Sequence, residues 1–449
     1  MEGLNVNDIN KYLLHFFNKK NLNLDIIKGN ISKIVNDLNN ITLYTNKHKY
    51  LSLSCVFGGF LGDAIGGNSE FFSPNEKNYK AIFNPKNCKR FYPGEITDDS
   101  EMAMSAAFAY MDAKNEKDQR IQDLIYYYFG IWKESGPKDM GNTTLNSLKY
   151  FSSSSNIENT KFGQTIQSMI EKTNWNSLSN GVLMRISTFI IFYYYTNYDK
   201  IDSTINGYFN SNNNNELTSN LMDLLSNIFT GVFSNAKITH PNPEISISAS
   251  VFCLMVLTGM IRNNAKDIYT LFKIICFSKK FTATTSEDYN HYAKITQKKF
   301  VEIIKEIENN KQIYVYHPMG YYMHGFKLSV YFLYKIMKNG DKIYSDLYYN
   351  IMCEICNLGG DTDTNCAIVG TMIGPLIGYH NFPKQLFDTF IHFFPTQRTQ
   401  FTSAFMYIYV NYLEEKYLYK AFFSEKGEEG IYKYPSFVKL LEFSTKKFD

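Results

Sequence analysis

The chain has 449 residues, of which 44% are hydrophobic and 16% aromatic, so it can bury a large core and is too apolar for a disordered protein. The formal net charge is only +3, and basic and acidic residues are interspersed, which gives no reason to expect a nucleic-acid partner. Seven unevenly spaced cysteines do not suggest a disulfide framework, and an odd number leaves one thiol unpaired. A reducing compartment fits this composition.

Residues 1–49 alternate apolar clusters with Lys and Asn, which predicts two amphipathic helices in an N-terminal extension. This extension could pack on the core, lie on a partner or mediate localisation, and we favour packing because such apolar stripes usually face a protein interior. This region begins with a polar, acidic run and lacks the pattern of a signal peptide. The most apolar segment, Ile245–Ile261, contains several Ser and is short for a bilayer span of about 20 residues, so we expect a buried helix. A cytoplasmic location follows as an expectation, which leaves the nucleus open.

The segment from Val56 to Gly62 is apolar and rich in glycine, and it leads into Asp63 and a second glycine pair. Glycines on a helix permit close packing against a neighbour. The segment is no phosphate loop, because it lacks the Gly-Lys-Ser/Thr ending and no strand precedes it. Glu70 follows shortly after, and without this context a solvent-facing glutamate would be the preferred interpretation.

Two acidic stretches stand where helices are expected to begin. Thr97-Asp98-Asp99-Ser100 precedes a predicted helix that ends near Asp112, and Gly359–Asn365 precedes the apolar segment Cys366–Gly378. A helix cap needs only one side chain, and further carboxylates nearby repel each other unless a cation intervenes. Ligands that are all oxygen select magnesium, calcium or manganese over zinc. We therefore favour a metal site over simple capping.

Between these stretches, several motifs leave two interpretations open. The start of a helix at Asp139–Thr144 can accept a phosphate or be capped by its own side chains. The loop Asn176–Gly181 offers backbone N–H groups that could cradle a diphosphate, ahead of an apolar helix over residues 182–195. Arg185 could bind phosphate, but we favour a structural role in which it ties helices together through an internal carboxylate.

The second half of the chain is mostly helical in pattern. Residues 199–220 are rich in Asn and Ser and predict an inserted surface loop. Apolar or charged helical patterns cover Pro243–Asn264 and Lys279–Lys311. Cys353 and Cys356 lie in an apparent helix, where two buried residues are expected rather than a zinc pair.

Helical periodicity predominates and strand signals are scarce, so we predict an all-α fold with a loop-built cleft. The expected division is an extension at 1–49 and a main domain at 50–449. Within that domain we expect a motif-bearing core at about 51–380, the insertion at about 199–220 and a C-terminal helical extension at about 381–449.

The order of the motifs resembles the ADP-ribosylglycohydrolase family. The resemblance covers roughly residues 51–380 and rests on the ordered series rather than on one member. The motifs are Gly62-Asp63-Ala64-Ile65-Gly66 with Glu70, Thr97-Asp98-Asp99-Ser100, Asp139-Met140-Gly141-Asn142-Thr143-Thr144, Asn180-Gly181-Val182-Leu183-Met184-Arg185, Thr239-His240-Pro241-Asn242-Pro243 and Gly359 to Thr364. Ser100 stands where many relatives have Thr, and it keeps the hydroxyl.

The resemblance implies that residues 50–449 form a catalytic domain, a compact orthogonal multi-helix domain whose loop-built cleft holds two Mg²⁺ ions, for which Mn²⁺ can substitute. The implied metal ligands are Glu70, Thr97, Asp98, Asp99, Asp361, Asp363 and Thr364, with Asp363 as the bridge. The implied catalytic residues are Glu70, Asp98, Asp99 and Asp361, and which carboxylate is the base stays open. The implied substrate contacts are Asn180, Gly181, Met184, His240, Gly320 and Tyr321, the last by stacking on adenine.

The implied reaction is hydrolysis of the glycosidic bond between ADP-ribose and a modified protein side chain or another ADP-ribose conjugate. We expect a monomer, and the linkage stays open among arginine, serine, other acceptors and polymer. One alternative is an inactive ADP-ribose-binding or crystallin-like member, against which the intact acidic motifs argue. Another is a metal-dependent hydrolase of a free nucleotide-linked substrate.

Overall fold

The fold is known from a computed structural model that describes residues 31–74, 79–80, 83, 90–115, 117–152, 157–211, 214–279, 281, 287–395, 398 and 401–418. These residues form helices, and the one β pairing among them is an isolated antiparallel bridge between Ser179 and Tyr321. The predicted all-α fold is therefore confirmed. The helices are α3 (Ile31–Asn40), α4 (Lys47–Gly66), α5 (Asp98–Asp112), α6 (Ile121–Glu134), α7 (Asn142–Leu148), α8 (Gln164–Asn174), α9 (Ser187–Thr196), α10 (Tyr198–Asn210), α11 (Asn214–Ala236), α12 (Pro243–Arg262), α13 (Ala265–Phe277), α14 (Glu287–Glu308), α15 (Tyr322–Lys338), α16 (Leu347–Leu358), α17 (Thr362–Ile377), η1 (Tyr379–Asn381), α18 (Lys384–Ile391), α19 (Phe405–Leu413) and the π-helical η2 (Glu414–Leu418).

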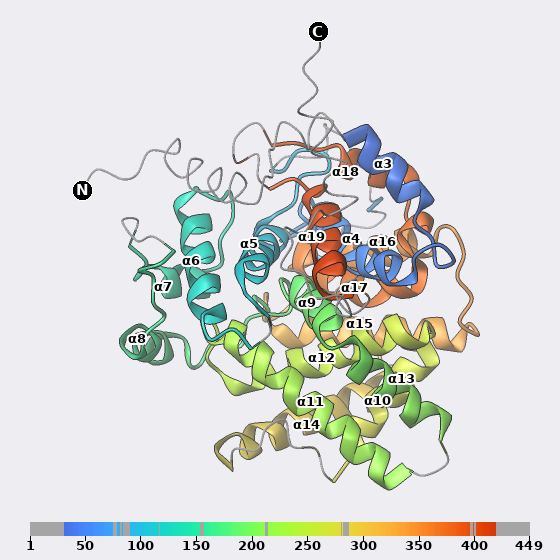
Figure 1. Cartoon of the computed structure of the whole chain (residues 1–449). Coiled ribbons are helices and arrows are strands. Elements are labelled where there is room, and N and C mark those ends of the chain that lie inside the picture. The colour runs from blue at the N-terminus through green and yellow to red at the C-terminus, as the bar shows by residue number, and fades with distance from the viewer. Residues whose placement is uncertain are drawn as a thin grey trace, which may run out of the picture.

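Helices α4 and α17 form the centre of the molecule and pack against each other along their lengths (Figure 1). Both are apolar on all sides, and every residue of α17 is buried. A helix that is hydrophobic all round is stable only inside a protein, so the sequence of each helix already requires burial. Helices α5 and α19 cover one side of the pair, whereas α12, α15 and α16 cover another.

Glycines allow α4 and α17 to approach closely. Gly58 and Gly370 face each other, and a Cβ on either would overlap the other's carbonyl group. Gly62 lies against the Cys366 backbone in the same way, and Gly66 lies against Thr362. The predicted role of these glycines in close helix packing is confirmed, and the contact places the C-terminal end of α4 beside the first turn of α17.

Helix α12 is the segment that the sequence marked as most apolar. Among the described residues, α12 is the one helix that is long and apolar enough to cross a membrane. Its apolar stretch is 100% buried inside the protein. Its neighbours are α11, α13, α14 and α17. The expectation of a buried core helix is confirmed.

The prediction of a surface loop over residues 199–220 is wrong, because most of this stretch belongs to α10 and α11. Ile201 and Ile205 are four residues apart and fully buried on one face of α10, which packs against α11 and α12. This apolar stripe outweighs the weak helix propensity of the surrounding Asn and Ser. The helix predicted over 182–195 also starts later than expected, at Ser187.

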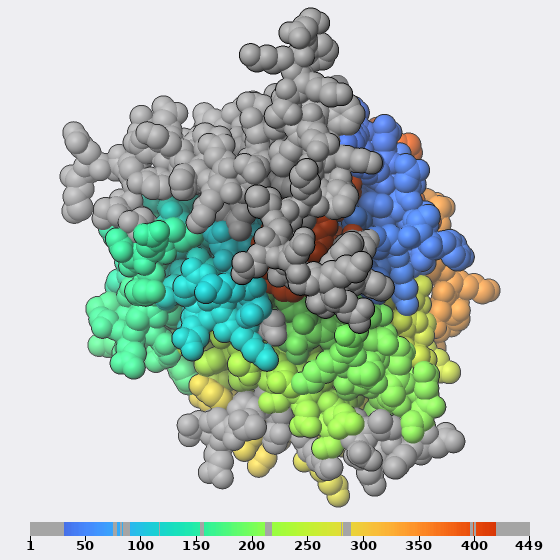
Figure 2. Space-filling view, viewed as in Figure 1, coloured from blue at the N-terminus to red at the C-terminus, as the bar shows by residue number. Residues whose placement is uncertain are grey.

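The two ends of the chain are only partly described. Of the two helices predicted before residue 50, the second is α3, which stands at the surface (Figure 2) and buries Ile34 and Leu38. The first falls within residues 1–30, outside the described residues. Helices α18 and α19 pack on α4, and residues 419–449 again lie outside the described part. The proposed division of the chain at residues 49 and 380 stays a prediction.

Substituting Gly62→Ala tests the central helix contact. The added methyl group meets the Cys366 backbone, which cannot rotate away, so we expect a loss of stability of about 1–3 kcal/mol despite the better helix propensity of alanine. Urea denaturation measures this loss. Gly163→Ala is the matched control, since nothing lies within 4 Å of a Cβ added there. Equal stability of the two variants would contradict the close approach.

Candidate active site

In the first turn of α17, Asp363 Oδ1 accepts from the backbone N–H of Thr364 at 2.8 Å, whereas the acidic residue at the N-cap makes no such bond. Asp361 occupies the N-cap position, yet its side chain makes no capping hydrogen bond to the first turn, which the structure describes in full. One Asp361 oxygen, Oδ2, instead accepts from Asn180 Nδ2 at 2.7 Å. The preceding Gly359 and Gly360 have φ of 71° and 84°, a region that favours glycine. The tight turn at these glycines directs the Asp361 carboxylate into a cavity.

The start of α5 is capped by its own Thr97, whose Oγ1 accepts from the backbone N–H of Asp99 at 3.4 Å, and also by a residue from α4. The fully buried Asp63 accepts the backbone N–H groups of Thr97 and Ser100, each at 3.1 Å. Burial raises the pKa of Asp63 to about 6, against the lowering effect of these hydrogen bonds. Because Asp63 satisfies the helix end, the carboxylates of Asp98 and Asp99 are left for the cavity.

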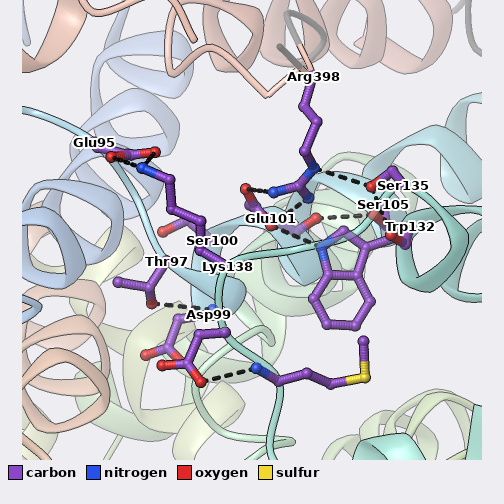
Figure 3. A network of polar contacts seen from close by, with 12 residues as sticks. Glu95, Thr97, Asp99, Ser100, Glu101, Ser105, Trp132, Ser135, Lys138 and Arg398 are labelled. Carbon is purple, nitrogen blue, oxygen red and sulfur yellow. Dashed lines mark hydrogen bonds and ion pairs between the residues drawn. The ribbon is translucent and has the colours of Figure 1, made fainter. Parts of the chain in front are cut away.

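A buried polar network fixes the first turn of α5 from the opposite side (Figure 3). Glu101 accepts two hydrogen bonds from Arg398, at 2.7 and 2.6 Å, and one from Trp132 Nε1 at 2.8 Å. Arg398 also donates to Ser135 Oγ. A bidentate pair with this much support holds its geometry well. It anchors α5 three residues after Asp98.

Carboxylates from three separate segments meet at one place. Glu70, Asp361 and Asp363 each offer an oxygen, and these three oxygens lie within 4.8 Å of one another. Asp98 and Asp99 line the same cavity. Thr364 Oγ1 donates to Asp99 Oδ1 at 3.2 Å and so connects the starts of α17 and α5.

Burial and mutual repulsion disfavour the charged form of this cluster. Burial first, and then the carboxylates of Asp361 and Asp139, raise the pKa of Glu70 to about 8. Burial is also the largest cause that raises the pKa values of Asp98, Asp99 and Asp363 well above their usual range. In each case neighbouring carboxylates raise the pKa further. The cluster therefore has too few positively charged neighbours to stabilise its ionised form.

A divalent cation fits the residues present. Asp99 Oδ2 is buried and has no hydrogen-bond partner among the described residues, which is costly for a carboxylate oxygen. The surrounding donors are carboxylate and hydroxyl oxygens, the ligands that hard cations prefer. The three clustered carboxylates therefore form a candidate metal site, as the sequence predicted.

The cavity beside this cluster has a volume of about 440 Å³, within the range of small-molecule sites. Most of the predicted residues contribute to its wall. Two do not: Thr97 is buried behind the acidic residues, and the Tyr321 ring packs on Tyr322 and His324. Stacking of Tyr321 on adenine stays a prediction. The lining residues are Glu70, Phe71, Asp98, Asp99, Asp139, Met140, Gly141, Asn142, Thr143, Thr144, Ser179, Asn180, Gly181, Met184, His240, Met319, Gly320, Asp361, Asp363 and Thr364.

The loop before Gly181 contributes mainly side chains to the cavity. The backbone N–H of Asn180 donates to the Gly320 carbonyl at 2.9 Å and that of Ser177 to Asn174, so the predicted diphosphate cradle is wrong at these two positions. Ser179 Oγ bonds His240 Nε2 at 2.7 Å. Burial, followed by the charge of Arg185, lowers the pKa of His240 well below its usual range, and His240 stays neutral at pH 7.

Arg185 has the structural role that we favoured, but with different partners. Its fully buried guanidinium donates to the Gly181 carbonyl, to Thr239 Oγ1 and to Asn235 Oδ1, and it lies over the Phe129 ring. No carboxylate pairs with it among the described residues, so the predicted internal carboxylate is wrong. Neutral oxygens replace that carboxylate, and burial lowers the pKa of Arg185 to about 9.

Three residues of the site were not recognised as such in the sequence. Asp63 belongs to a quoted motif, and its capping role depends on the distant start of α5. Asp139 was considered only as part of a helix start, whereas its carboxylate lines the acidic cavity. Arg90 carries no signal in the sequence, yet its side chain bonds both Glu70 and Asp139.

An all-helical protein in which helix starts gather buried carboxylates around a cavity offers the oxygen ligands that hard divalent cations prefer. The family model of the ADP-ribosylglycohydrolases matches residues 46–409. The chain therefore belongs to the ADP-ribosylglycohydrolase family and is a hydrolase of glycosyl bonds, which confirms the resemblance of its motifs.

Two relatives by sequence carry names that belong to this family. A protein of Acanthamoeba polyphaga mimivirus, L543, provisionally named an ADP-ribosyl glycohydrolase, is 26% identical over 77% of this chain and 92% of its own length. The ADP-ribosylarginine hydrolase Tri1 of Serratia proteamaculans is 22% identical over 75% and 74%, respectively. A solved structure described as an ADP-ribosylglycohydrolase-related protein complex gives a TM-score of 0.49 at 14% identity and covers 82% of this chain and 99% of that one.

The raised pKa of Glu70 predicts how the stability of metal-free protein depends on pH. The folded-state pKa of about 8 exceeds the ordinary value of 4.5, so the folded state binds more protons and the free energy of unfolding falls as pH rises toward 8. Buried histidines with lowered pKa act in the opposite sense, but only below about pH 6.5. Between pH 6.5 and 8 we therefore expect a fall on the order of 1–2 kcal/mol in EDTA.

Urea denaturation at several pH values measures this fall, and Glu70→Gln is the control because it removes the titrating group. We expect the variant to lose part of the pH dependence and magnesium to restore more stability at pH 8 than at pH 6.5. A free energy of unfolding that rises over this window in EDTA would refute the assignment.

Proposed function

We propose that the protein hydrolyses the glycosidic bond between ADP-ribose and a modified protein side chain in a magnesium-dependent reaction, and so reverses ADP-ribosylation. The observation that carries the proposal is the convergence of Glu70, Asp361 and Asp363 within 4.8 Å in an acidic cavity. Family membership supports the type of bond. The names of the Serratia relative and of a Rhodospirillum rubrum ADP-ribosyl-[dinitrogen reductase] glycohydrolase, 30% identical over 104 residues, support a protein-linked substrate.

Two magnesium ions would be held by the residues at the two helix starts and by Glu70. When bound, the ions would polarise the attacking water and orient the hydroxyls of the distal ribose. Both helix starts would supply carboxylate oxygens, Asp98 and Asp99 from α5 and Asp361 and Asp363 from the start of α17. The proposed ligands are Glu70, Thr97, Asp98, Asp99, Asp361, Asp363 and Thr364.

The side chains of this chain have distinct tasks in the proposed reaction. Glu70 would take a proton from the attacking water, because its carboxylate lies in the cavity beside the other acidic residues and bound cations would favour its ionised form. Asn180 donates to Asp361 Oδ2 and fixes that carboxylate. Ser179 and the neutral His240 line the same cavity and would offer hydrogen-bonding groups to a ribose or diphosphate.

Release of ADP-ribose from arginine-linked, serine-linked and polymeric substrates tests the proposal. We expect release from at least one protein-linked substrate with magnesium and none with excess EDTA, and the preferred substrate names the linkage. Binding of ADP-ribose without any release would favour the inactive binding member instead. Release that is unaffected by EDTA would contradict the metal dependence.

Two single substitutions test the roles of the acidic cluster in metal binding and turnover. Asp361→Asn keeps an oxygen for Asn180 and removes one repulsive charge, so we expect stability in EDTA to be kept while magnesium binding and turnover are lost. Glu70→Gln should bind ADP-ribose and turn over about 100-fold more slowly or worse. Calorimetric titration with magnesium and a turnover assay measure both. Full turnover in either variant would remove that residue from the proposed role.

A further inference from the structure

Arg90 makes a bridge across the rim of the acidic cavity. Its Nη1 donates to Glu70 Oε2 at 2.5 Å, and its Nη2 donates to Asp139 Oδ2 at 2.6 Å. Glu70 follows the end of α4, whereas Asp139 precedes α7. One guanidinium therefore joins two walls of the cavity that are 69 residues apart in the chain.

The bridge is fixed from behind by aromatic rings. The guanidinium carbon lies 5.2 Å from the centre of the Phe91 ring, which is buried, and 5.8 Å from that of Phe71. A planar guanidinium is suited to stack on aromatic rings while its two outer nitrogens bind separate carboxylates. A lysine could supply the positive charge but not the two separate nitrogens that bind Glu70 and Asp139 at once.

Positive charge is scarce at this place. No lysine or arginine lines the cavity among the described residues, and the nearby Lys138 is paired with Glu95. The Glu70 side chain is only 9% exposed, although that of Arg90 is 39% exposed. The ion pair is therefore well shielded on the side of Glu70, where geometry matters for proton transfer.

We propose that Arg90 is a positioning residue, which holds one oxygen of Glu70 through the bridge to Asp139 and so presents the other oxygen to the reacting water. This inference rests on the proposed function. Arg90 touches neither substrate nor metal in this scheme. The consequence is a loss of turnover, without a loss of magnesium affinity, when the bridge is removed.

Arg90→Met and Arg90→Lys test this role. Methionine keeps an unbranched stem against Phe91 and removes the fork and the charge, and we expect its kcat to fall about 10- to 100-fold with KM changed less than threefold. Lysine should recover only part of kcat. Arg120→Met is the matched control, since Arg120 forms an ion pair with Asp118 and is 49% exposed outside the site.

Magnesium binding, measured by calorimetry without substrate, separates positioning from damage to the fold. We expect Arg90→Met to bind magnesium at least as tightly as wild type, because one positive charge has left the acidic cluster. Weaker magnesium binding together with reduced thermal stability would mean a structural role and would overturn the proposal.

A double-mutant cycle tests the bridge itself. If Arg90 acts through its link to Asp139, Asp139→Asn in the Arg90→Met background should cost less turnover than in the wild-type background. If the fold losses in turnover of the two single variants multiply in the double variant, the two residues act independently and the proposed bridge is rejected. If wild type itself releases no ADP-ribose, the proposed function fails, whereas an active wild type with fully active Arg90→Met leaves that function intact and rejects only the role of Arg90.

Discussion

The close approach of α4 and α17 is the constraint on which the rest of the structure depends. Backbone-to-backbone contact at glycine positions such as Gly58 and Gly370 leaves no room for side chains between the helices. The end of α4 therefore lies beside the start of α17, so that Asp63 can cap α5 and Glu70 can approach Asp361. The carboxylates meet because two helices are packed more tightly than side chains would allow.

Charge distribution at the site follows from this packing. Helix starts carry partial positive charge and attract carboxylates, but burial of five or six such groups exceeds what two helix ends can offset. The Asp99 oxygen without a hydrogen-bond partner and the raised pKa of Glu70 both result from this lack of positive charge near the carboxylates. The fold has thus placed repulsive carboxylates together, which the proposed cations would neutralise, while Arg90 pairs with two carboxylates at the rim.

Much of this could be predicted from the sequence, and the exceptions have physical reasons. The helix starts at Asp98 and Thr362 were predicted because capping signals and apolar periodicity are local. The helices over residues 199–220 were missed because Ile201 and Ile205 gain their helical structure from burial against α12. The partners of Arg185 and the bridge of Arg90 depend on which distant segments meet, and local pattern carries no information about that.

The distance along the chain between the two central helices also shapes how the protein can form. About 300 residues separate α4 from α17, and closing a loop of that length costs about 5 kcal/mol of chain entropy before the contact is made. During synthesis, α4 cannot pack against α17 until most of the chain has left the ribosome. Folding should therefore be slow and dominated by non-local contacts, and no N-terminal fragment that ends before α17 contains either the core or the acidic site.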